Sequence, residues 1–421
     1  MDNKSAEEYV GTYIDLFSGC GGFSLGLGRA GWKGLFAVEK DPMAFSTFQH
    51  NMVKVGSKYG HFDWVDWLPQ EATTIQKLIE NHHDNLLGLR GRVDLIAGGP
   101  PCQGFSMAGM RNSNDPRNKM SQEYIKMVGL IRPKYLLLEN VRGFNSAFKK
   151  KSDGSDSIPY AKIVQESIER EGYKVFKDYI HSERFGVPQT RTRFIMVGIR
   201  DDVFSENNQS PFVILEDIRR KFLQDKGLTL SPVTVKEAIS DLETSSASLI
   251  NHSGPSENSF KKLDYKVPEK LSPYQALMRI GLDKQKPNSL RLARHRKTTI
   301  NKFKLIQTIC RPGIVLSDKE KAIIGTKKQT ITVLDPHKPS KTITTLPDDI
   351  LHYSEPRILT VRENARIQSF PDDFDFTGRY TTGGERRKKE CPRYTQVGNA
   401  VPPLLGEALG VLIRNIKCNL K

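Results

Sequence analysis

A cysteine at the end of an apolar segment is the first residue whose surroundings indicate chemistry. Cys102 follows the stretch Val93–Ala97 and the tetrapeptide Gly-Gly-Pro-Pro. The prolines hold the backbone extended, and residues 103–120 are rich in Gly, Ser, Asn and Arg, like a loop able to close over a substrate. A lone cysteine is more often a small buried apolar residue, but glycine- and proline-rich backbone builds a core poorly. We predict that Cys102 is a nucleophile, which requires a nearby cation or base to favour its thiolate.

Further polar side chains lie at the ends of other apolar segments. Glu139 is a candidate acid, with a helix cap or a surface charge as the alternative. Gln189, Arg191 and Arg193 lead into the apolar segment Phe194–Ile199. In an extended strand these three would project from one face. Two guanidinium groups together would suit a phosphate or a polarised carbonyl, although an exposed strand edge would also accommodate them.

A glycine-rich segment after the first apolar stretch predicts a cofactor site. Residues 15–22 read DLFSGCGG, and these glycines allow a tight turn and close approach to a ligand. Glu39 ends the next apolar stretch, about twenty residues on, where an acidic side chain commonly binds a ribose hydroxyl. The glycine-rich segment and Glu39 together favour a cofactor that contains adenosine. The spacing is not the GxGxxG of dinucleotide-binding proteins, and glycines kept for packing alone are the alternative.

These residues need a sheet to position them. The predicted strands are Tyr13–Phe17, Leu35–Val38, Val93–Ala97, Tyr135–Leu138, Val175–Ile180 and Phe194–Ile199. Helical patterns separate them, such as Tyr160, Val164 and Ile168 before Gly172. This alternation predicts an α/β fold with a doubly wound, mostly parallel Rossmann-like sheet. Ligands in such folds bind beyond the carboxyl ends of the strands, where the candidate residues fall.

The pattern changes after about residue 200. Residues 201–330 are polar and irregular, which predicts a second, smaller, mixed domain. An apolar helix over 404–416 then needs a core to cover, and the sheet of the first domain is the obvious one. The expected division is a first domain at 1–200, completed by 393–421, and a second domain at 201–392.

Charge and composition narrow the class of protein. The formal net charge is +16, and residues 261–330 hold an excess of Lys and Arg. A basic surface attracts a polyanion such as nucleic acid, although solubility alone would also account for it. The 5 cysteines are odd in number and form no CxxC pair, which favours reduced thiols in a cytosol over disulfides or a zinc site. No apolar run is long enough to span a membrane.

Taken together, the segments resemble the cytosine-C5 DNA methyltransferase family of the bacterial restriction–modification type. The motifs stand in the family's order: DLFSGCGG at 15–22, PPCQGFS at 100–106, ENV at 139–141, QTRTR at 189–193, ARIQSFPDDF at 365–374 and GNAV at 398–401. The resemblance covers roughly 1–200 and 330–421. The segment between these two matched regions, about 201–330, corresponds to the family's variable target-recognition region.

The resemblance implies a DNA (cytosine-5-)-methyltransferase that acts on a cytosine flipped out of the duplex. Cys102 matches the nucleophile that adds to C6, and Glu139 the group that protonates or hydrogen-bonds N3. Arg193 resembles the arginine that contacts the cytosine carbonyl oxygen, and Arg191 its neighbour near the nucleophile and a phosphate.

The resemblance also implies S-adenosyl-L-methionine as methyl donor, with S-adenosyl-L-homocysteine as product and no metal. The expected cofactor-binding residues are Phe17, Ser18, Gly19, Cys20, Gly21, Gly22, Glu39, Asp66, Pro101 and Asn399. Asp63 fits the acidic position near the adenine as well, and our choice leans to Asp66. The expected DNA-binding residues are Gln103, Ser106, Gln189, Arg294, Arg296 and Lys297.

Double-stranded DNA is the expected partner. The resemblance implies a bacterial cytoplasmic monomer that protects host DNA from a cognate restriction endonuclease without a stable complex. Methylation of RNA, an inactive DNA-binding regulator and a dinucleotide-dependent oxidoreductase are the alternatives. The long recognition region disfavours the first, the intact Cys102 and Glu139 disfavour the second, and the glycine spacing disfavours the third.

Overall fold

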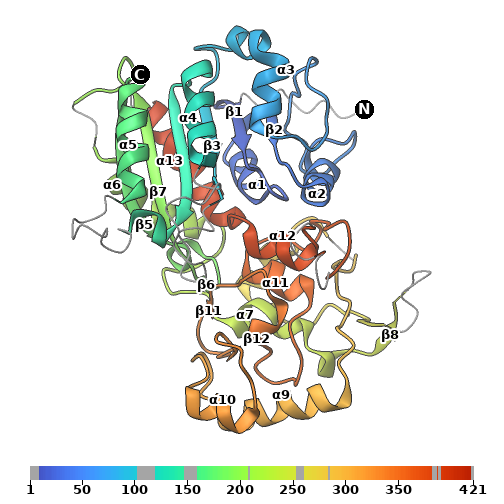
Figure 1. The fold of residues 1–421 in the computed structure, drawn as a ribbon. Helices are drawn as coiled ribbons and strands as arrows, with labels where there is room; N and C mark the ends of the chain where they lie inside the picture. The colour runs from blue at the N-terminus through green and yellow to red at the C-terminus, as the bar shows by residue number, and fades with distance from the viewer. Residues whose placement is uncertain are drawn as a thin grey trace. The chain divides into compact units, whose positions relative to one another are not determined.

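A computed structural model of the chain describes residues 9–101, 119–146, 159–206, 209–252, 260–282, 285–381, 386 and 390–418 (Figure 1). The chain divides into two compact units. The first comprises Met1–His181, Thr192–Arg219 and Leu405–Lys421, and the second comprises Ser182–Arg191 and Arg220–Leu404. Each unit has a hydrophobic core of its own.

A six-stranded sheet forms the centre of the first unit, in the order β2-β1-β3-β4-β7-β5. The strands are β1 (Gly11–Leu16), β2 (Trp32–Val38), β3 (Leu95–Gly98), β4 (Tyr135–Val141), β5 (Tyr173–His181) and β7 (Thr192–Arg200). Strands β1 to β4 pair in parallel, and β7 runs antiparallel between β4 and β5. The six predicted strands and the mostly parallel α/β sheet are confirmed.

Helices cover both faces of this sheet, because neighbouring residues of a strand point to opposite sides. The helices are α1 (Gly22–Arg29), α2 (Pro42–Met52), α3 (Ile75–Gly88), α4 (Lys119–Ile131), α5 (Tyr160–Arg170), α6 (Pro211–Gln224) and α13 (Pro403–Cys418). Ile14 of β1 joins a core cluster with buried residues of α3, α4 and α5. Its neighbour Tyr13 instead contacts the carbonyl of Ser24 in α1, at 3.4 Å.

The C-terminal helix α13 returns to the first unit, as its apolar pattern predicts. Its buried residues include Leu404, Leu405, Ala408, Leu409, Leu412 and Ile413. The indole of Trp32 donates to the carbonyl of Gly410 at 3.0 Å. A Cβ at Gly410 would lie 2.7 Å from that of Ala30, so the two helices α1 and α13 pack at this glycine without room for a side chain.

Short elements make up the second unit. Its helices are α7 (Val235–Ile239), α8 (Pro273–Met278), α9 (Lys297–Ile309), α10 (Asp318–Ile324), α11 (Val361–Ile367) and α12 (Arg393–Asn399). Its strands are β6 (Gln189–Thr190), β8 (Leu249–Asn251), β9 (Lys261–Leu263), β10 (Thr332–Val333), β11 (Ser340–Lys341) and β12 (Ile350–Leu351), which pair only in twos. Helices α7, α8, α10 and α11 each begin with a capping box, so side-chain caps fix these short helices in an irregular chain.

Candidate active site

The turn between β1 and α1 has a backbone that few side chains adopt. Phe17, Gly19 and Gly21 have φ angles of 64°, 56° and 98°, in the left-handed region that favours glycine. A non-glycine residue in this region stores strain, and such residues concentrate at functional sites. At Gly21 a Cβ would lie 2.8 Å from the terminal methyl of Met52. This glycine therefore serves packing as well as conformation.

The turn is open beside Gly19. A Cβ at Gly19 would meet no atom of the described residues within 4 Å. The hydroxyl of Ser18 is buried, with 7% of the residue exposed, and has no hydrogen-bond partner in the described part of the chain. The carboxylate of Glu39 accepts from the amides of Gly19 at 3.0 Å and Asp41 at 2.7 Å, and retains lone pairs for a further donor. Free space, an unused hydroxyl and this carboxylate fit the ribose of an adenosine cofactor.

Cys20 lies in the same turn but is not a nucleophile. Its side chain is buried, and this burial raises the pKa of the thiol to about 12. The residue therefore remains a neutral thiol near pH 7 and packs as a small apolar side chain. Only its backbone can serve a ligand.

Asp15 is a buried acid that the sequence did not single out. It ends β1 with 1% of its surface exposed and accepts a hydrogen bond from the hydroxyl of Ser24 at 2.5 Å. Burial raises the pKa of Asp15 to about 7, the Ser24 contact lowers it and the nearby Glu39 carboxylate raises it. Two carboxylates beside one turn therefore make this end of the sheet sensitive to pH.

Neutralising Asp15 should change how stability depends on pH. A carboxyl whose pKa is higher in the folded than in the unfolded state contributes stability that is lost as pH rises toward the folded value. Between pH 5.5 and 8 the unmodified protein should therefore lose about 2 kcal/mol relative to Asp15→Asn. Urea unfolding followed by tryptophan fluorescence measures this, since Trp32, Trp64 and Trp67 all lie in the first unit. Asp84→Asn, at a fully exposed side chain, is the control, and equal slopes for all three proteins would contradict the prediction.

The two candidate acids for the adenine differ in their surroundings. The segment around Phe62 extends the sheet through a parallel bridge to Gly34 of β2. Asp63 is 72% exposed and forms an ion pair with Lys33, near the start of β2, at 3.2 Å. Asp66 lies three residues further along, past the point where the amide of Val65 bonds to Leu35 at 3.2 Å. Because β2 and this segment run in parallel, Asp66 is the nearer of the two to the carboxyl edge of the sheet.

The ends of β3 and β4 bring Pro100 and Glu139 together. The side-chain amide of Asn140 donates to the carbonyl of Pro100 at 3.1 Å and is buried. A Cβ at Gly99 would lie 3.2 Å from Glu139 Oε2, so glycine lets the chain pass close to this carboxylate. Sequence reasoning missed Asn140, whose only signal is its place between Glu139 and Val141 in the ENV motif.

Arg193 forms a buried ion pair with Glu139. The Nε atom lies 2.6 Å from Glu139 Oε1, and the two side chains are 8% and 12% exposed. In the register of the sheet Arg193 stands opposite Val141, two residues from Glu139, so the contact is a diagonal one between β7 and β4. Burial lowers the pKa of Arg193 and the Glu139 carboxylate raises it. The predicted acid and one predicted arginine therefore lie together.

The prediction that Gln189, Arg191 and Arg193 project from one strand face was wrong. The chain turns between them, because the amide of Arg191 bonds to the carbonyl of Gln189 at 2.8 Å. The Arg191 guanidinium donates to the carbonyls of Ile343, Gly398 and Ala400 at 3.1 to 3.3 Å, all within the second unit. Gln189 is fully buried and bonds to Gln368 at 2.7 Å and the amide of Ile343 at 2.8 Å. Both side chains hold the second unit together.

The other predicted site residues either lie outside the described residues or are exposed residues of the second unit. Cys102, Gln103 and Ser106 lie outside the described residues, which end at Pro101 before this segment. Arg294, Arg296 and Lys297 are exposed around the start of α9. Asn399 is the exposed last residue of α12.

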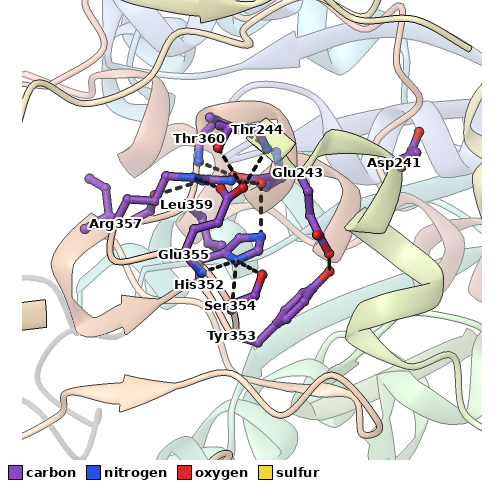
Figure 2. A network of polar contacts seen from close by, with 12 residues as sticks. Asp241, Glu243, Thr244, His352, Tyr353, Ser354, Glu355, Arg357, Leu359 and Thr360 are labelled. Carbon is purple, nitrogen blue, oxygen red and sulfur yellow. Dashed lines mark hydrogen bonds and ion pairs between the residues drawn. The ribbon is translucent and has the colours of Figure 1, made fainter. Parts of the chain in front are cut away.

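A polar network in the second unit, shown in Figure 2, is built on the fully buried residues His352 and Glu363. Arg357 donates to both oxygens of Glu363 at 2.8 Å and to Glu355 at 2.5 Å. The Nδ1 atom of His352 accepts from the amide of Ser354 at 3.2 Å. Burial lowers the pKa of His352 although Glu363 raises it, so the ring is neutral near pH 7. The network joins chain segments of the second unit that lie far apart in the sequence.

The motif at 365–374 contributes a second buried network. Arg366 is fully buried and contacts Asp241 at 2.6 and 2.9 Å and Asp372 at 2.7 Å through both oxygens. Sequence reasoning recognised the motif but assigned this arginine no role. Arg366, Asp241 and Asp372 form a structural ion triad that joins segments of the second unit far apart in the sequence.

Within the described residues, no group of three or more His, Cys, Asp or Glu side chains could hold a metal ion. None of the helices in the described part of the chain is long and apolar enough to cross a membrane.

Comparison with known proteins identifies the family. The model of the C-5 cytosine-specific DNA methylase family matches residues 11–415. The Type II methyltransferase M1.HphI of Haemophilus parahaemolyticus is 32% identical over 97% of this chain and 88% of its own length. M.DdeI of Desulfomicrobium norvegicum is 31% identical over 94% and 86%.

Solved structures share the fold. A prophage-encoded DNA modification methyltransferase (E. coli) superposes with a TM-score of 0.64 at 23% identity, over 96% of this chain and 99% of that one. The Dnmt2 methyltransferase of S. pombe gives 0.54 at 14% identity, over 97% and 99%. With the family model spanning nearly the whole chain and the motifs in order, the chain belongs to the C-5 cytosine-specific DNA methylase family and is a DNA cytosine-C5 methyltransferase.

Proposed function

We propose that Cys102, Glu139 and Arg193 methylate a flipped-out cytosine of duplex DNA through a covalent intermediate. The observation that supports this most is the buried Glu139–Arg193 pair, 2.6 Å apart, at the end of the strand beside Pro100. Arg191, whose guanidinium holds three backbone carbonyls, is assigned to positioning.

The chemistry of cytosine explains why these groups are needed. The thiolate of Cys102 adds to C6, and the C5–C6 π electrons move onto C5, which is otherwise a poor nucleophile. Glu139 protonates or hydrogen-bonds N3, which stabilises the charge that the ring gains. C5 then forms its bond to the methyl group and loses its proton to a base. The C6–S bond then breaks as the C5–C6 double bond re-forms, and a proton taken up by N3 returns to Glu139. These steps release the thiolate and 5-methylcytosine.

The ion pair also accounts for how the base is held. N3 and the O2 carbonyl are adjacent on cytosine, and the Glu139 carboxyl and Arg193 guanidinium are adjacent in the protein. One buried pair can therefore bind both positions, with Glu139 at N3 and Arg193 at O2. Because Glu139 bonds to Arg193 in the protein alone, the entering base has to share or replace that contact.

S-adenosyl-L-methionine, when bound, supplies an electrophilic methyl group, and S-adenosyl-L-homocysteine remains. The backbone of the turn from Phe17 to Gly22 and the hydroxyl of Ser18 would hold it, and Glu39 would accept from its ribose hydroxyls. Asp66 is preferred to Asp63 near the adenine, since Asp63 is paired with Lys33. Pro101 and Asn399 complete the proposed set.

The first unit is proposed to carry catalysis and the second to recognise double-stranded DNA. The basic residues Arg294, Arg296 and Lys297, all exposed, suit contacts with phosphates. Since M1.HphI and M.DdeI are Type II methyltransferases, the proposed role is protection of host DNA in a bacterial cytoplasm. The enzyme would act as a monomer beside a cognate endonuclease, without a stable complex.

Covalent trapping tests this mechanism. The protein is incubated with S-adenosyl-L-methionine and duplex DNA that carries 5-fluorocytosine. Fluorine cannot leave C5 as a proton does, so the reaction should stall as an adduct that survives denaturation. Cys102→Ser should form no adduct and lose methyl transfer, yet still bind the cofactor.

Cys391→Ser is the matched control, because Cys391 is a cysteine of the second unit that forms no disulfide with a described residue. This variant should form the adduct at the rate of the unmodified protein. Turnover retained by Cys102→Ser would contradict covalent catalysis by this thiol. Absence of an adduct on all duplex DNA, with cofactor binding intact, would contradict the proposed function itself.

A further inference from the structure

Asp15 is a buried carboxylate without a counter-cation. The residue lies near the end of β1 with 1% of its surface exposed, and the hydroxyl of Ser24 donates a hydrogen bond to it at 2.5 Å. Among the residues that the structure describes, no Lys, Arg or His side chain forms an ion pair with this carboxylate. Burying a negative charge without an opposite charge costs free energy, so these surroundings disfavour the ionised form of Asp15.

The groups that act on the Asp15 charge are neutral or negative. Burial raises the pKa of Asp15, and the carboxylate of Glu39, directly after β2, raises it as well. Tyr13 of β1 and Tyr124 of α4 interact with the Asp15 charge, and burial raises the pKa of both phenols well above the usual value, so both stay neutral near pH 7. Lys40 acts on Glu39 but is exposed, where water weakens its field.

The turn that follows Asp15 shows two independent signs of a ligand. The hydroxyl of Ser18 is buried and has no hydrogen-bond partner within the described part of the chain. A Cβ at Gly19 would meet no atom of the described residues within 4 Å. An unused polar group and free space suit a bound molecule. Because the nearby acids lack a cation, a positively charged ligand fits this end of the sheet better than a neutral one.

We propose that the Asp15 carboxylate raises the affinity for S-adenosyl-L-methionine relative to S-adenosyl-L-homocysteine. The two molecules share an adenosine, an amino group and a carboxylate, and they differ by one methyl group and the positive charge of the sulfonium. Only the sulfonium offsets the cost of ionising the buried acid. Asp15 is then a specificity-determining residue that acts by charge and favours exchange of the product for fresh methyl donor. This inference rests on the proposed cofactor site and deepens it.

Binding of the methyl donor should release a proton from Asp15 when the pH is below the pKa of this residue. That pKa is raised to about 7 in the protein alone. The sulfonium charge lowers it, so the proton passes to the buffer, whereas the neutral product leaves the proton in place. We call the dissociation constant of S-adenosyl-L-homocysteine divided by that of S-adenosyl-L-methionine the cofactor preference. It should fall roughly tenfold from pH 8 to pH 6.

Isothermal titration calorimetry measures this proton on the unmodified enzyme. Each ligand is titrated at pH 6 and pH 8, in two buffers that differ in ionisation enthalpy, which gives the number of protons released. S-adenosyl-L-methionine should release about 0.9 proton more than S-adenosyl-L-homocysteine at pH 6, and about 0.1 more at pH 8. Sinefungin, which carries an ammonium group in place of the sulfonium, should behave as the methyl donor does, because Asp15 senses the charge and not the methyl group.

The Asp15→Asn variant keeps the shape of the side chain and removes its charge. Its cofactor preference at pH 8 should be roughly 5- to 50-fold lower than that of the unmodified enzyme, with no further change at pH 6. Asp94→Asn is the matched control, since Asp94 is also a buried acid of the first unit. Asp94 accepts from the amide of Thr12, near the start of β1, at 3.1 Å, so it lies at the other end of this strand. This control should show an unchanged preference and proton release.

The unmodified enzyme tests the inference even if Asp15→Asn does not fold. Equal proton release by the methyl donor and the product at pH 6 would overturn the inference, and so would proton release by sinefungin that matches the product. A cofactor preference of Asp15→Asn equal to that of the unmodified enzyme would overturn it as well. Failure of the unmodified enzyme to bind S-adenosyl-L-methionine would instead overturn the proposed function.

Discussion

The Glu139→Gln variant is expected to transfer methyl groups about 10²- to 10⁴-fold more slowly than the unmodified enzyme. Glutamine has nearly the shape of glutamate and can still accept a hydrogen bond from Arg193, but it has no acidic proton for N3. The ring charge that follows attack at C6 would then be stabilised poorly. Single-turnover transfer of a labelled methyl group, at saturating DNA and cofactor, measures the chemical step directly.

The same substitution should also lower stability, because the Arg193 charge would stay buried without its carboxylate. Removing one partner of a buried ion pair costs about 3–5 kcal/mol, so rates must be compared where both proteins are folded. Glu166→Gln, at a half-exposed residue of α5, is the matched control and should change neither property. A Glu139→Gln enzyme with an unchanged rate would exclude Glu139 from proton transfer.

The sheet and the end of β4 could be predicted because local patterns determine them. Short apolar segments that alternate with helical ones leave few arrangements other than a parallel sheet. Glu139 lies near the end of β4, and Cys102 follows an apolar segment in the sequence. Both belong to recognisable motifs, so their importance is visible in the sequence. Four capping boxes, such as Thr234 with Glu237, were equally visible and would have placed the short helices of the second unit.

Contacts between distant segments could not be predicted in this way. Alternation along a strand placed Gln189 and Arg191 beside Arg193, but a turn at Arg191 breaks the strand. Neither spacing nor residue type shows that the Arg191 guanidinium reaches the carbonyl of Gly398. The approach of Asp241 to Arg366, 125 positions apart, likewise depends on tertiary packing and has no local signal.

The Arg366→Met variant is expected to lose at least about 3–5 kcal/mol of unfolding free energy. Methionine fills much of the volume but leaves the carboxylates of Asp241 and Asp372 buried, with Arg366 no longer balancing them. The side chains of Asp241 and Asp372 are 1% and 0% exposed. Two like charges repel each other strongly where water cannot screen them. Urea unfolding followed by far-UV circular dichroism is the suitable measurement, since the three tryptophans lie in the first unit and report on it alone.

Charge and lost packing can be separated as causes of this instability. Arg170→Met, at an exposed position of α5, makes the same substitution and should change stability by less than about 0.5 kcal/mol. Adding Asp241→Asn and Asp372→Asn to Arg366→Met removes the charges of both carboxylates without restoring the arginine's volume. If charge is the cause, this triple variant should recover a large part of the loss, because neutral partners are far less costly to bury. A triple variant as unstable as Arg366→Met would show instead that the arginine acts by filling space between the segments that it joins.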